Sequence, residues 1–306
     1  MIKYGSGAGG SAGLPDEGIG AYTMKRFDAV ASVILALGSV VLAGCEDAPW
    51  HLDPLAINGR DGGGPPANYS TLMRIGAAAH AGGDLATAVS VYRRAAAMEP
   101  RSVAPYVAAG NTLLELGQFN EAIVTYHSAL EHDERDPEAL RGLARAYLMS
   151  AKPELASQPL AVAFQGTPDD PKLLQLIGVA DDFAGQHEEA QARYRRGLEL
   201  LPRDPALTLN FALSLALTGN YPEAVAALRP LATAPTSSPR ERQTLALIYG
   251  LQGDQRAAEQ MARKDLDGAS VQRNLAYYDS LRRLSPQARQ KAIRSLGMQP
   301  TPSQSS

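Results

Sequence analysis

Residues 103–136 read VAPYVAAGNTLLELGQFNEAIVTYHSALEHDERD, and residues 171–204 read PKLLQLIGVADDFAGQHEEAQARYRRGLELLPRD. Both stretches are 34 residues long and hold a glycine at the same position. The glycines at this spacing along the chain are Gly83, Gly117, Gly185, Gly219 and Gly253, with Ala151 in the one remaining slot. Self-similarity at a period of this length is the signature of stacked helical hairpins. The column is therefore predicted to be the turn between two helices, where glycine enters the left-handed region without steric cost.

Two further columns hold a small residue in every repeat, as expected where antiparallel helices approach closely. The column before the turn is Gly76, Gly110, Ala144, Gly178, Ala212 and Ala246. The column after the turn is Ala88, Ala122, Ala156, Ala190, Ala224 and Ala258. Larger residues predicted to fill the core include Tyr92, Tyr126, Leu160, Tyr194 and Leu228. Prolines predicted to open first helices are Pro137, Pro171, Pro205 and Pro239.

This pattern is typical of tetratricopeptide repeats and predicts an all-α, right-handed superhelical solenoid. The six predicted hairpins, residues 69–272, are 69–102, 103–136, 137–170, 171–204, 205–238 and 239–272. Pro230 predicts an early end to the second helix of repeat five. Repeat six has Asp265 where a small or apolar residue is usual. Capping helices are predicted at 273–297, followed by a disordered tail at 298–306.

The N-terminal region resembles a bacterial lipoprotein signal at residues 24–44. Met24-Lys25-Arg26 precedes an apolar segment that ends at Cys45, the only cysteine, which the resemblance makes the lipid attachment site. Residues 1–23 are interpreted as an upstream mis-start or a disordered segment, and residues 45–68, rich in Pro, Gly and Asp, as a flexible tether. The alternatives are a membrane helix and a buried structural cysteine. Glu46 after the cysteine favours the periplasmic face of the outer membrane by the same resemblance.

Composition disfavours several functional classes. The net charge of -3 gives no reason to expect nucleic-acid binding. The five histidines lack metal-ligand spacing and are interpreted as solvated, and so are the acidic pairs Asp181-Asp182 and Glu188-Glu189. No nucleophile elbow or phosphate loop occurs. We therefore expect a binding protein without enzymatic activity, cofactor, metal or small-molecule substrate.

First helices of such a solenoid line a concave groove, which is predicted to bind a protein or peptide partner. The predicted groove residues are Asn111, Arg141, Arg145, Lys172, Val179, Phe183, Leu213 and Leu247. Arg141 and Arg145 lie one helical turn apart and are expected to hold a carboxylate together. The alternative is structural: the arginines pair with Glu138 and Asp181, and leucines such as Leu247 pack in the core.

The C-terminal segment RQTLALIYGLQG at 242–253, followed by Asp265-Leu266 and NLAYY at 274–278, resembles the TadD family. These are tetratricopeptide lipoproteins of the Flp/Tad type IVb pilus system. The resemblance implies an assembly role, with pilus or secretin components as partners. A lipoprotein adaptor for peptidoglycan-processing enzymes is the alternative.

Overall fold

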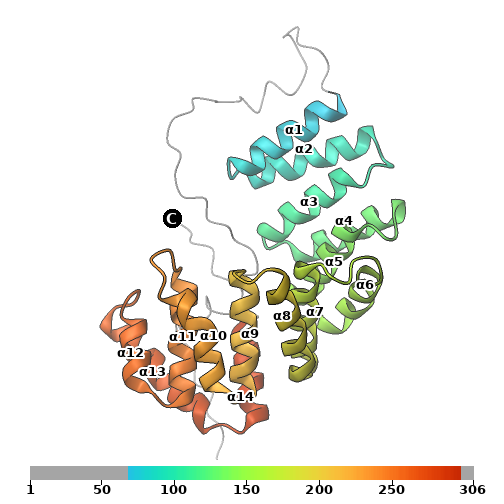
Figure 1. Ribbon diagram of the computed structural model, residues 1–306. Coiled ribbons are helices and arrows are strands. Elements are labelled where there is room, and N and C mark those ends of the chain that lie inside the picture. The colour runs from blue at the N-terminus through green and yellow to red at the C-terminus, as the bar shows by residue number, and fades with distance from the viewer. Residues whose placement is uncertain (1–67, 298–306) are drawn as a thin grey trace, which may run out of the picture.

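The computed structural model describes residues 68–297, which form fourteen α-helices and no strand. The first helices of the six hairpins are α1 (Tyr69–Ala81), α3 (Ala104–Glu115), α5 (Pro137–Met149), α7 (Pro171–Ala184), α9 (Pro205–Leu217) and α11 (Pro239–Gln252). The second helices are α2 (Leu85–Met98), α4 (Phe119–His132), α6 (Pro153–Gly166), α8 (His187–Leu200), α10 (Tyr221–Ala232) and α12 (Gln255–Ala262). Two further helices follow, α13 (Gly268–Arg283) and α14 (Pro286–Gly297). The hairpins stack one after another from α1 to α12 (Figure 1), which confirms the all-α solenoid.

The turn between the helices of each hairpin has one conformation throughout. All five turn glycines have positive φ, from 73° at Gly117 to 94° at Gly253. Ala151 has φ 59° and is the only non-glycine residue in the left-handed region within 68–297. Its amide N–H donates to the carbonyl of Leu148 at 3.2 Å, which ties the chain back to the end of α5. The turn predicted from the glycine column is confirmed.

Complementary side-chain sizes hold the two helices of each hairpin together. Repeats one, two and four combine glycine with tyrosine in the pairs Gly76–Tyr92, Gly110–Tyr126 and Gly178–Tyr194. A Cβ added at Gly76 would lie 2.5 Å from the Tyr92 ring, so only glycine fits beside it. Repeats three and five combine alanine with leucine in the same two columns, Ala144 with Leu160 and Ala212 with Leu228. In repeats one to five the hairpin interior therefore keeps its volume by changing both partners at once, whereas repeat six has alanine in both columns, Ala246 and Ala262.

An aspartate-proline pair starts the first helix of repeats three, four and five. Asp136, Asp170 and Asp204 each accept a hydrogen bond from a backbone N–H in the first turn of the helix that follows. The next residue is proline, whose missing N–H has no partner to lose at this position. First helices of successive repeats also contact one another from α3 to α11, so they form the inner layer of the solenoid.

The C-terminal end departs from the repeat. Helix α12 ends at Ala262, and α13 begins at Gly268, inside the predicted sixth repeat rather than at 273. The physical reason is Asp265: its carboxylate accepts hydrogen bonds from Arg242 and Gln243 on α11, so this segment packs as a loop. Helix α10 ends at Ala232, soon after Pro230, which confirms its predicted early end.

Helix α14 folds back toward repeat five. Arg289 donates hydrogen bonds to the carbonyls of Leu281, Arg282 and Leu284, which satisfies the free end of α13. Its remaining Nη1 donates to the Tyr221 hydroxyl at 2.7 Å, and α14 also contacts α9. The C-terminal helices thus cover repeats five and six, as predicted for a cap.

The predicted signal at 24–44, the lipid site Cys45, the tether and the tail at 298–306 lie outside the described residues. Within 68–297, none of the helices is both long and apolar enough to cross a membrane.

Candidate functional site

A polar cluster joins repeats two and three at the centre of the predicted groove. Asn111 and Arg145 occupy the same repeat position on α3 and α5, which lie side by side. Asn111 Oδ1 accepts one hydrogen bond from the Tyr126 hydroxyl at 2.7 Å and a second from Arg145 Nη2 at 3.3 Å. We call Asn111, Tyr126 and Arg145 the groove node.

Arg141 does not share the role predicted for the arginine pair. Its guanidinium forms ion pairs with Glu138 on the same helix and with Asp170, and its side chain is only 16% exposed. Burial lowers its pKa, but the hydrogen bonds and charges of the two carboxylates outweigh burial and raise it. Asp170 also caps α7, so Arg141 connects repeats three and four. The structural alternative, pairing with Glu138, is confirmed for this arginine.

Arg145 has no carboxylate partner within residues 68–297, and its buried Nε has no hydrogen-bond partner among them. The predicted pairing of an arginine with Asp181 is therefore not found at Arg145. Burial raises the pKa of the Tyr126 hydroxyl, and the charge of Arg145 opposes that rise, so Tyr126 stays protonated and donates to Asn111. The Arg145 side chain as a whole is only half-buried, so a partner carboxylate would reach the outer part of its guanidinium rather than the buried Nε.

The remaining predicted groove residues divide by burial. Lys172 is exposed at the start of α7, while Val179, Phe183 and Leu213 are half-buried at the edge of the core. Leu247 is only 2% exposed, so its prediction as an open groove residue is wrong. Helix α11 packs against both α9 and α13, and this coverage places Leu247 in the C-terminal core.

A second polar cluster, which the sequence interpretation missed, joins repeats four and five. Asp182 Oδ1 accepts from His187 Nδ1 at 2.6 Å and from the Ser214 hydroxyl at 2.8 Å, and Oδ2 accepts from the Tyr194 hydroxyl at 2.9 Å. We call these four residues the Asp182 node. The side chains of Asp182 and His187 are 16% and 11% exposed, so their interpretation as solvated residues is wrong.

Asp181 carries a sequence signal for this region. It occupies the column that holds the core residues Leu113 and Leu215 in other repeats, both 0% exposed. Burial raises its pKa to about 6, opposed by the charge of Arg193 and assisted by Asp182 and Glu189. An acidic residue at a repeat position that is otherwise apolar was therefore the signal in the sequence that polar residues are buried in this region.

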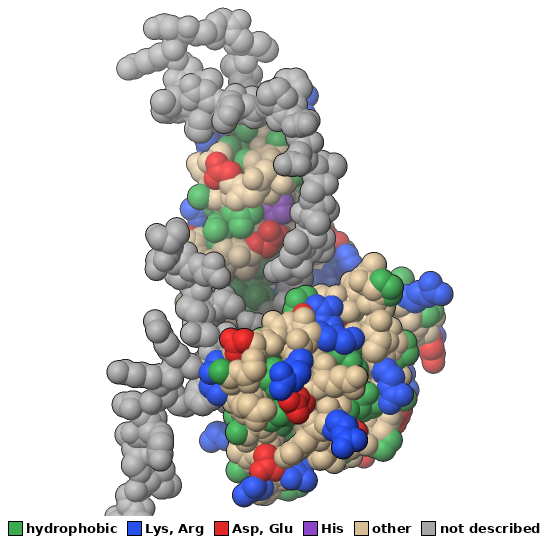
Figure 2. Space-filling view, turned by 90° about the vertical axis from the view of Figure 1, so that its left-hand side faces the viewer, with side chains coloured by type: hydrophobic (Ala, Val, Ile, Leu, Met, Phe, Trp, Pro, Cys, Tyr) green, Lys and Arg blue, Asp and Glu red, His purple; other side chains and the backbone are tan. Residues whose placement is uncertain are grey.

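The surface has no single charged stripe on the face shown in Figure 2: basic side chains are dispersed over its C-terminal half, with acidic ones among them. Residues 68–297 also contain no group of three or more His, Cys, Asp or Glu side chains that could hold a metal ion. The groove node is thus the best candidate site for a polypeptide partner.

Comparisons with known proteins agree with this fold. Two models of the tetratricopeptide repeat match residues 113–179 and 177–239. The chain is 30% identical over 137 residues to the general transcriptional corepressor ssn6 of Schizosaccharomyces pombe, a match covering 44% of this chain and 12% of that protein. It is 27% identical over 146 residues to anaphase-promoting complex subunit 7 of Arabidopsis thaliana, covering 47% and 26%. Most of each curated relative lies outside the match.

Three solved structures have the same architecture. A tetratricopeptide repeat protein from Parabacteroides merdae is similar with a TM-score of 0.58 and 17% identity, over 70% of this chain and 85% of that one. Pseudomonas aeruginosa pilF gives 0.57 and 19%, over 68% and 97%. PilW, a widely conserved type IV pilus biogenesis factor, gives 0.57 and 16%, over 63% and 90%. The period, the hairpins and the repeat models, which together match residues 113–239, show that this chain contains tandem tetratricopeptide repeats, and the solved structures share its fold.

Proposed function

We propose that this scaffold is lipid-anchored in the bacterial envelope, on the periplasmic face of the outer membrane, and assists assembly of a Flp/Tad pilus or its secretin. The observation that carries a binding role is Arg145: a half-buried guanidinium in the predicted groove, without a carboxylate partner in residues 68–297. Its neighbour Arg141, by contrast, is already paired with two carboxylates.

The groove node favours an acidic segment of a protein partner. A carboxylate would accept charge-assisted hydrogen bonds from Arg145, which are stronger than those between neutral groups. Half-buried Val179 and Leu213, on the next first helices along the groove, offer apolar contact to a hydrophobic side chain of the same segment. An extended or helical peptide with an acidic group and an apolar anchor fits both features.

Three observations support the envelope and pilus part of the proposal. Residues 24–44 and Cys45 resemble a lipoprotein signal with its acylated cysteine. The segments 242–253 and 274–278 resemble the TadD family. PilW, a type IV pilus biogenesis factor, shares the architecture of this chain.

The test uses a strain from which the chromosomal copy is deleted and the full chain is supplied as wild type or variant. Pilus filaments and secretin multimers in the outer membrane are measured. We expect Cys45→Ser to remove the protein from the membrane and to reduce both readouts. Arg145→Gln should leave the protein anchored but reduce both readouts about tenfold, since a charged hydrogen bond is lost.

Arg94→Gln is the matched control, because Arg94 is exposed on α2, outside the predicted groove. It should behave as wild type. Normal pili in the deletion strain would overturn the pilus role, and altered peptidoglycan in that strain would favour the adaptor for peptidoglycan-processing enzymes. If pili require the protein but Arg145→Gln has no effect on them, the assembly role stands and only the groove node is rejected as the binding site.

A further inference from the structure

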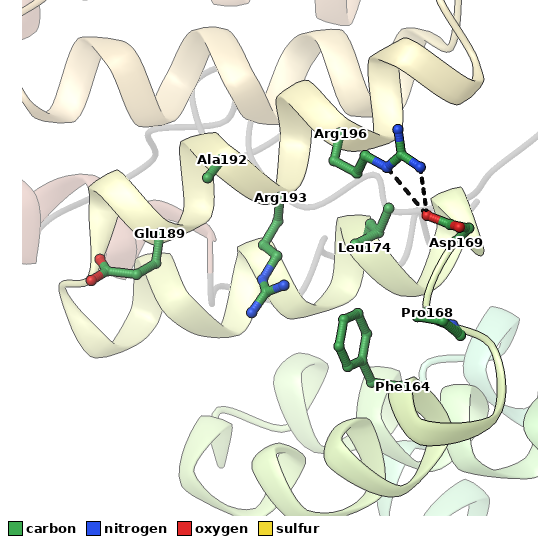
Figure 3. Close-up of a pocket in the computed structure, with 8 residues that line it drawn as sticks. All are labelled: Phe164, Pro168, Asp169, Leu174, Glu189, Ala192, Arg193 and Arg196. Carbon is green, nitrogen blue, oxygen red and sulfur yellow. Dashed lines mark hydrogen bonds and ion pairs between the residues drawn. The ribbon is translucent and has the colours of Figure 1, made fainter.

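A pocket of about 320 Å³ lies on the outer layer of the solenoid, away from the groove node. Second helix α8 supplies half of its lining residues, and Phe164 of α6, the loop before α7 and Leu174 of α7 supply the rest (Figure 3). Its lining residues are Phe164, Pro168, Asp169, Leu174, Glu189, Ala192, Arg193 and Arg196. We call it the outer pocket.

Two of these residues break the 34-residue pattern, and they meet each other. Phe164 is the only aromatic residue in its column, whose other members are Ala96, Leu130, Leu198, Ala232 and Leu266. Arg193 is the only charged residue in its column, whose other members are Val91, Thr125, Pro159, Ala227 and Met261. The Arg193 guanidinium carbon lies 5.1 Å from the centroid of the Phe164 ring. Neither Phe164 nor Arg193 is needed for the two helices of a hairpin to pack, because the other repeats have smaller, uncharged residues at these two positions.

The charges in the outer pocket are not equally available. Arg196 is paired with Asp169 at 2.8 Å and with Glu199 at 2.9 Å. Arg193 is stacked on Phe164 and forms no ion pair within residues 68–297. Glu189, one turn earlier on α8, points away from Phe164 (Figure 3). The outer pocket thus presents one guanidinium that lies in the field of Asp181 but forms no ion pair within residues 68–297, beside an apolar surface of Phe164 and Ala192 over buried Leu174.

We propose that the outer pocket is a second docking site, which binds a segment of a protein partner carrying a large apolar side chain next to a carboxylate. Its volume is at the lower end of ligand pockets, about 300–1,000 Å³, and suits one large side chain. Phe164 and Ala192 contact that side chain, and Arg193 donates hydrogen bonds to the carboxylate while its face remains on Phe164. The site shares no residue with the groove node, so the scaffold can hold two segments at once.

The experiment measures binding of a labelled peptide, acetyl-Ser-Glu-Leu-Phe-Asp-Ser-amide, to the full chain by fluorescence anisotropy. Two matched peptides are compared: one with amides in place of both carboxylates, and one with alanine in place of Leu and Phe. We expect the parent peptide to bind and each matched peptide to bind about tenfold more weakly. Arg193→Gln should weaken binding of the parent about tenfold.

Phe164→Leu should weaken it severalfold, and it should fold normally because leucine occupies this column in repeats two and four. Arg195→Gln is the control: Arg195 lies on the same helix but stacks on Phe211 at 5.1 Å, outside the pocket. Arg145→Gln separates this site from the groove. Absence of binding, equal binding of the amide peptide, or loss of binding through Arg145→Gln instead of Arg193→Gln would each overturn the proposal. A concentration-dependent oligomer that Arg193→Gln abolishes would overturn the assigned partner, because the occupant would then be a second copy.

Discussion

The hairpin interiors and the joints between repeats follow different rules. Inside the hairpins of repeats one to five, size is conserved: glycine meets tyrosine, and alanine occurs with leucine. The column from Ala88 to Ala258 is 0% exposed throughout. At the joints, side chains differ from one repeat to the next and are polar. The Arg145 hydrogen bond to Asn111 crosses one joint, and the Ser214 hydrogen bond to Asp182 crosses another. Tyr126, His187 and Tyr194 donate to the same two acceptors from within one hairpin.

This difference separates architecture from recognition. A hairpin interior is packed to a fixed volume, so a change there is tolerated only with a compensating change. A joint has to bring two first helices together, and several kinds of contact do so. The polar contacts that link successive first helices therefore differ from one joint of this chain to the next.

Removing the central acceptor of a joint is expected to have the largest effect. Asp182→Ala leaves the donors of His187, Tyr194 and Ser214 without their shared carboxylate. We expect the free energy of unfolding to fall by about 3 kcal/mol, measured by urea denaturation. Asp169→Ala at an exposed joint pair is the control and should cost about 0.5 kcal/mol or less. Similar losses in the two variants would contradict the view that the Asp182 node holds repeats four and five together.

Breaking the size rule inside a hairpin should cost somewhat less. Gly76→Ala brings a Cβ within 2.5 Å of the Tyr92 ring and should lower the free energy of unfolding by about 2 kcal/mol. Adding Tyr92→Leu recreates the alanine-leucine combination of repeats three and five and should restore about half of that loss. This pair suits the test because Tyr126 and Tyr194 also donate hydrogen bonds, to Asn111 and Asp182 of their own hairpins. Additive losses in the double variant would contradict the compensation.

The fold was predictable because its determinants are local and repeated. A turn glycine and two small columns in register leave only a helical hairpin as the unit, and a proline marks the start of several first helices. The C-terminal end of the array was less predictable. Asp265 stands where other repeats have a small or apolar residue, and the sequence did not show that its carboxylate binds Arg242 and Gln243 in a loop before α13.

The sequence predicted which repeat positions hold the residues of the candidate site, but not which other residues those side chains contact. Groove positions follow from the period, yet the sequence does not show which arginine already has a carboxylate. Arg141 reaches Asp170, which caps the first helix of the next repeat, whereas Arg145 donates to the Asn111 amide of the preceding repeat. Leu247 was misplaced for a similar reason, because the coverage of α11 by α13 depends on long-range packing. Such contacts depend on how neighbouring repeats are oriented, and the residues at one repeat position do not show that orientation.

A smaller effect, dependent on pH, tests whether joint polarity costs stability. Burial raises the folded-state pKa of Asp181 to about 6, from an ordinary value of 3.8. The fold therefore favours the protonated carboxyl: its contribution is complete below about pH 4 and is lost as the pH rises through about 6. Asp181→Asn should raise the free energy of unfolding by about 1 kcal/mol near neutral pH, after allowance for solvent screening, and change it little in acid. Denaturation curves of both proteins across this pH range check the sign, and an equal gain at every pH would exclude titration of Asp181 as the cause.

The smallest expected effect concerns the one hairpin turn that lacks glycine. Ala151 has φ 59°, a region in which a Cβ costs about 1 kcal/mol. Ala151→Gly relieves this strain but gives the unfolded chain more freedom, so we expect a net stabilisation of about 0.5 kcal/mol. Gly219→Ala is the matched reverse change: its φ is 84°, and an added Cβ would meet no atom within 4 Å, so backbone strain alone should cost about 1 kcal/mol. Opposite signs for the two substitutions, measured by urea denaturation, would show that hairpin turns obey one backbone rule in all repeats. A loss of stability in both variants would instead mean that contacts with neighbouring repeats stabilise the turn after α5. The claim that hairpins and joints follow different rules would then be wrong for repeat three.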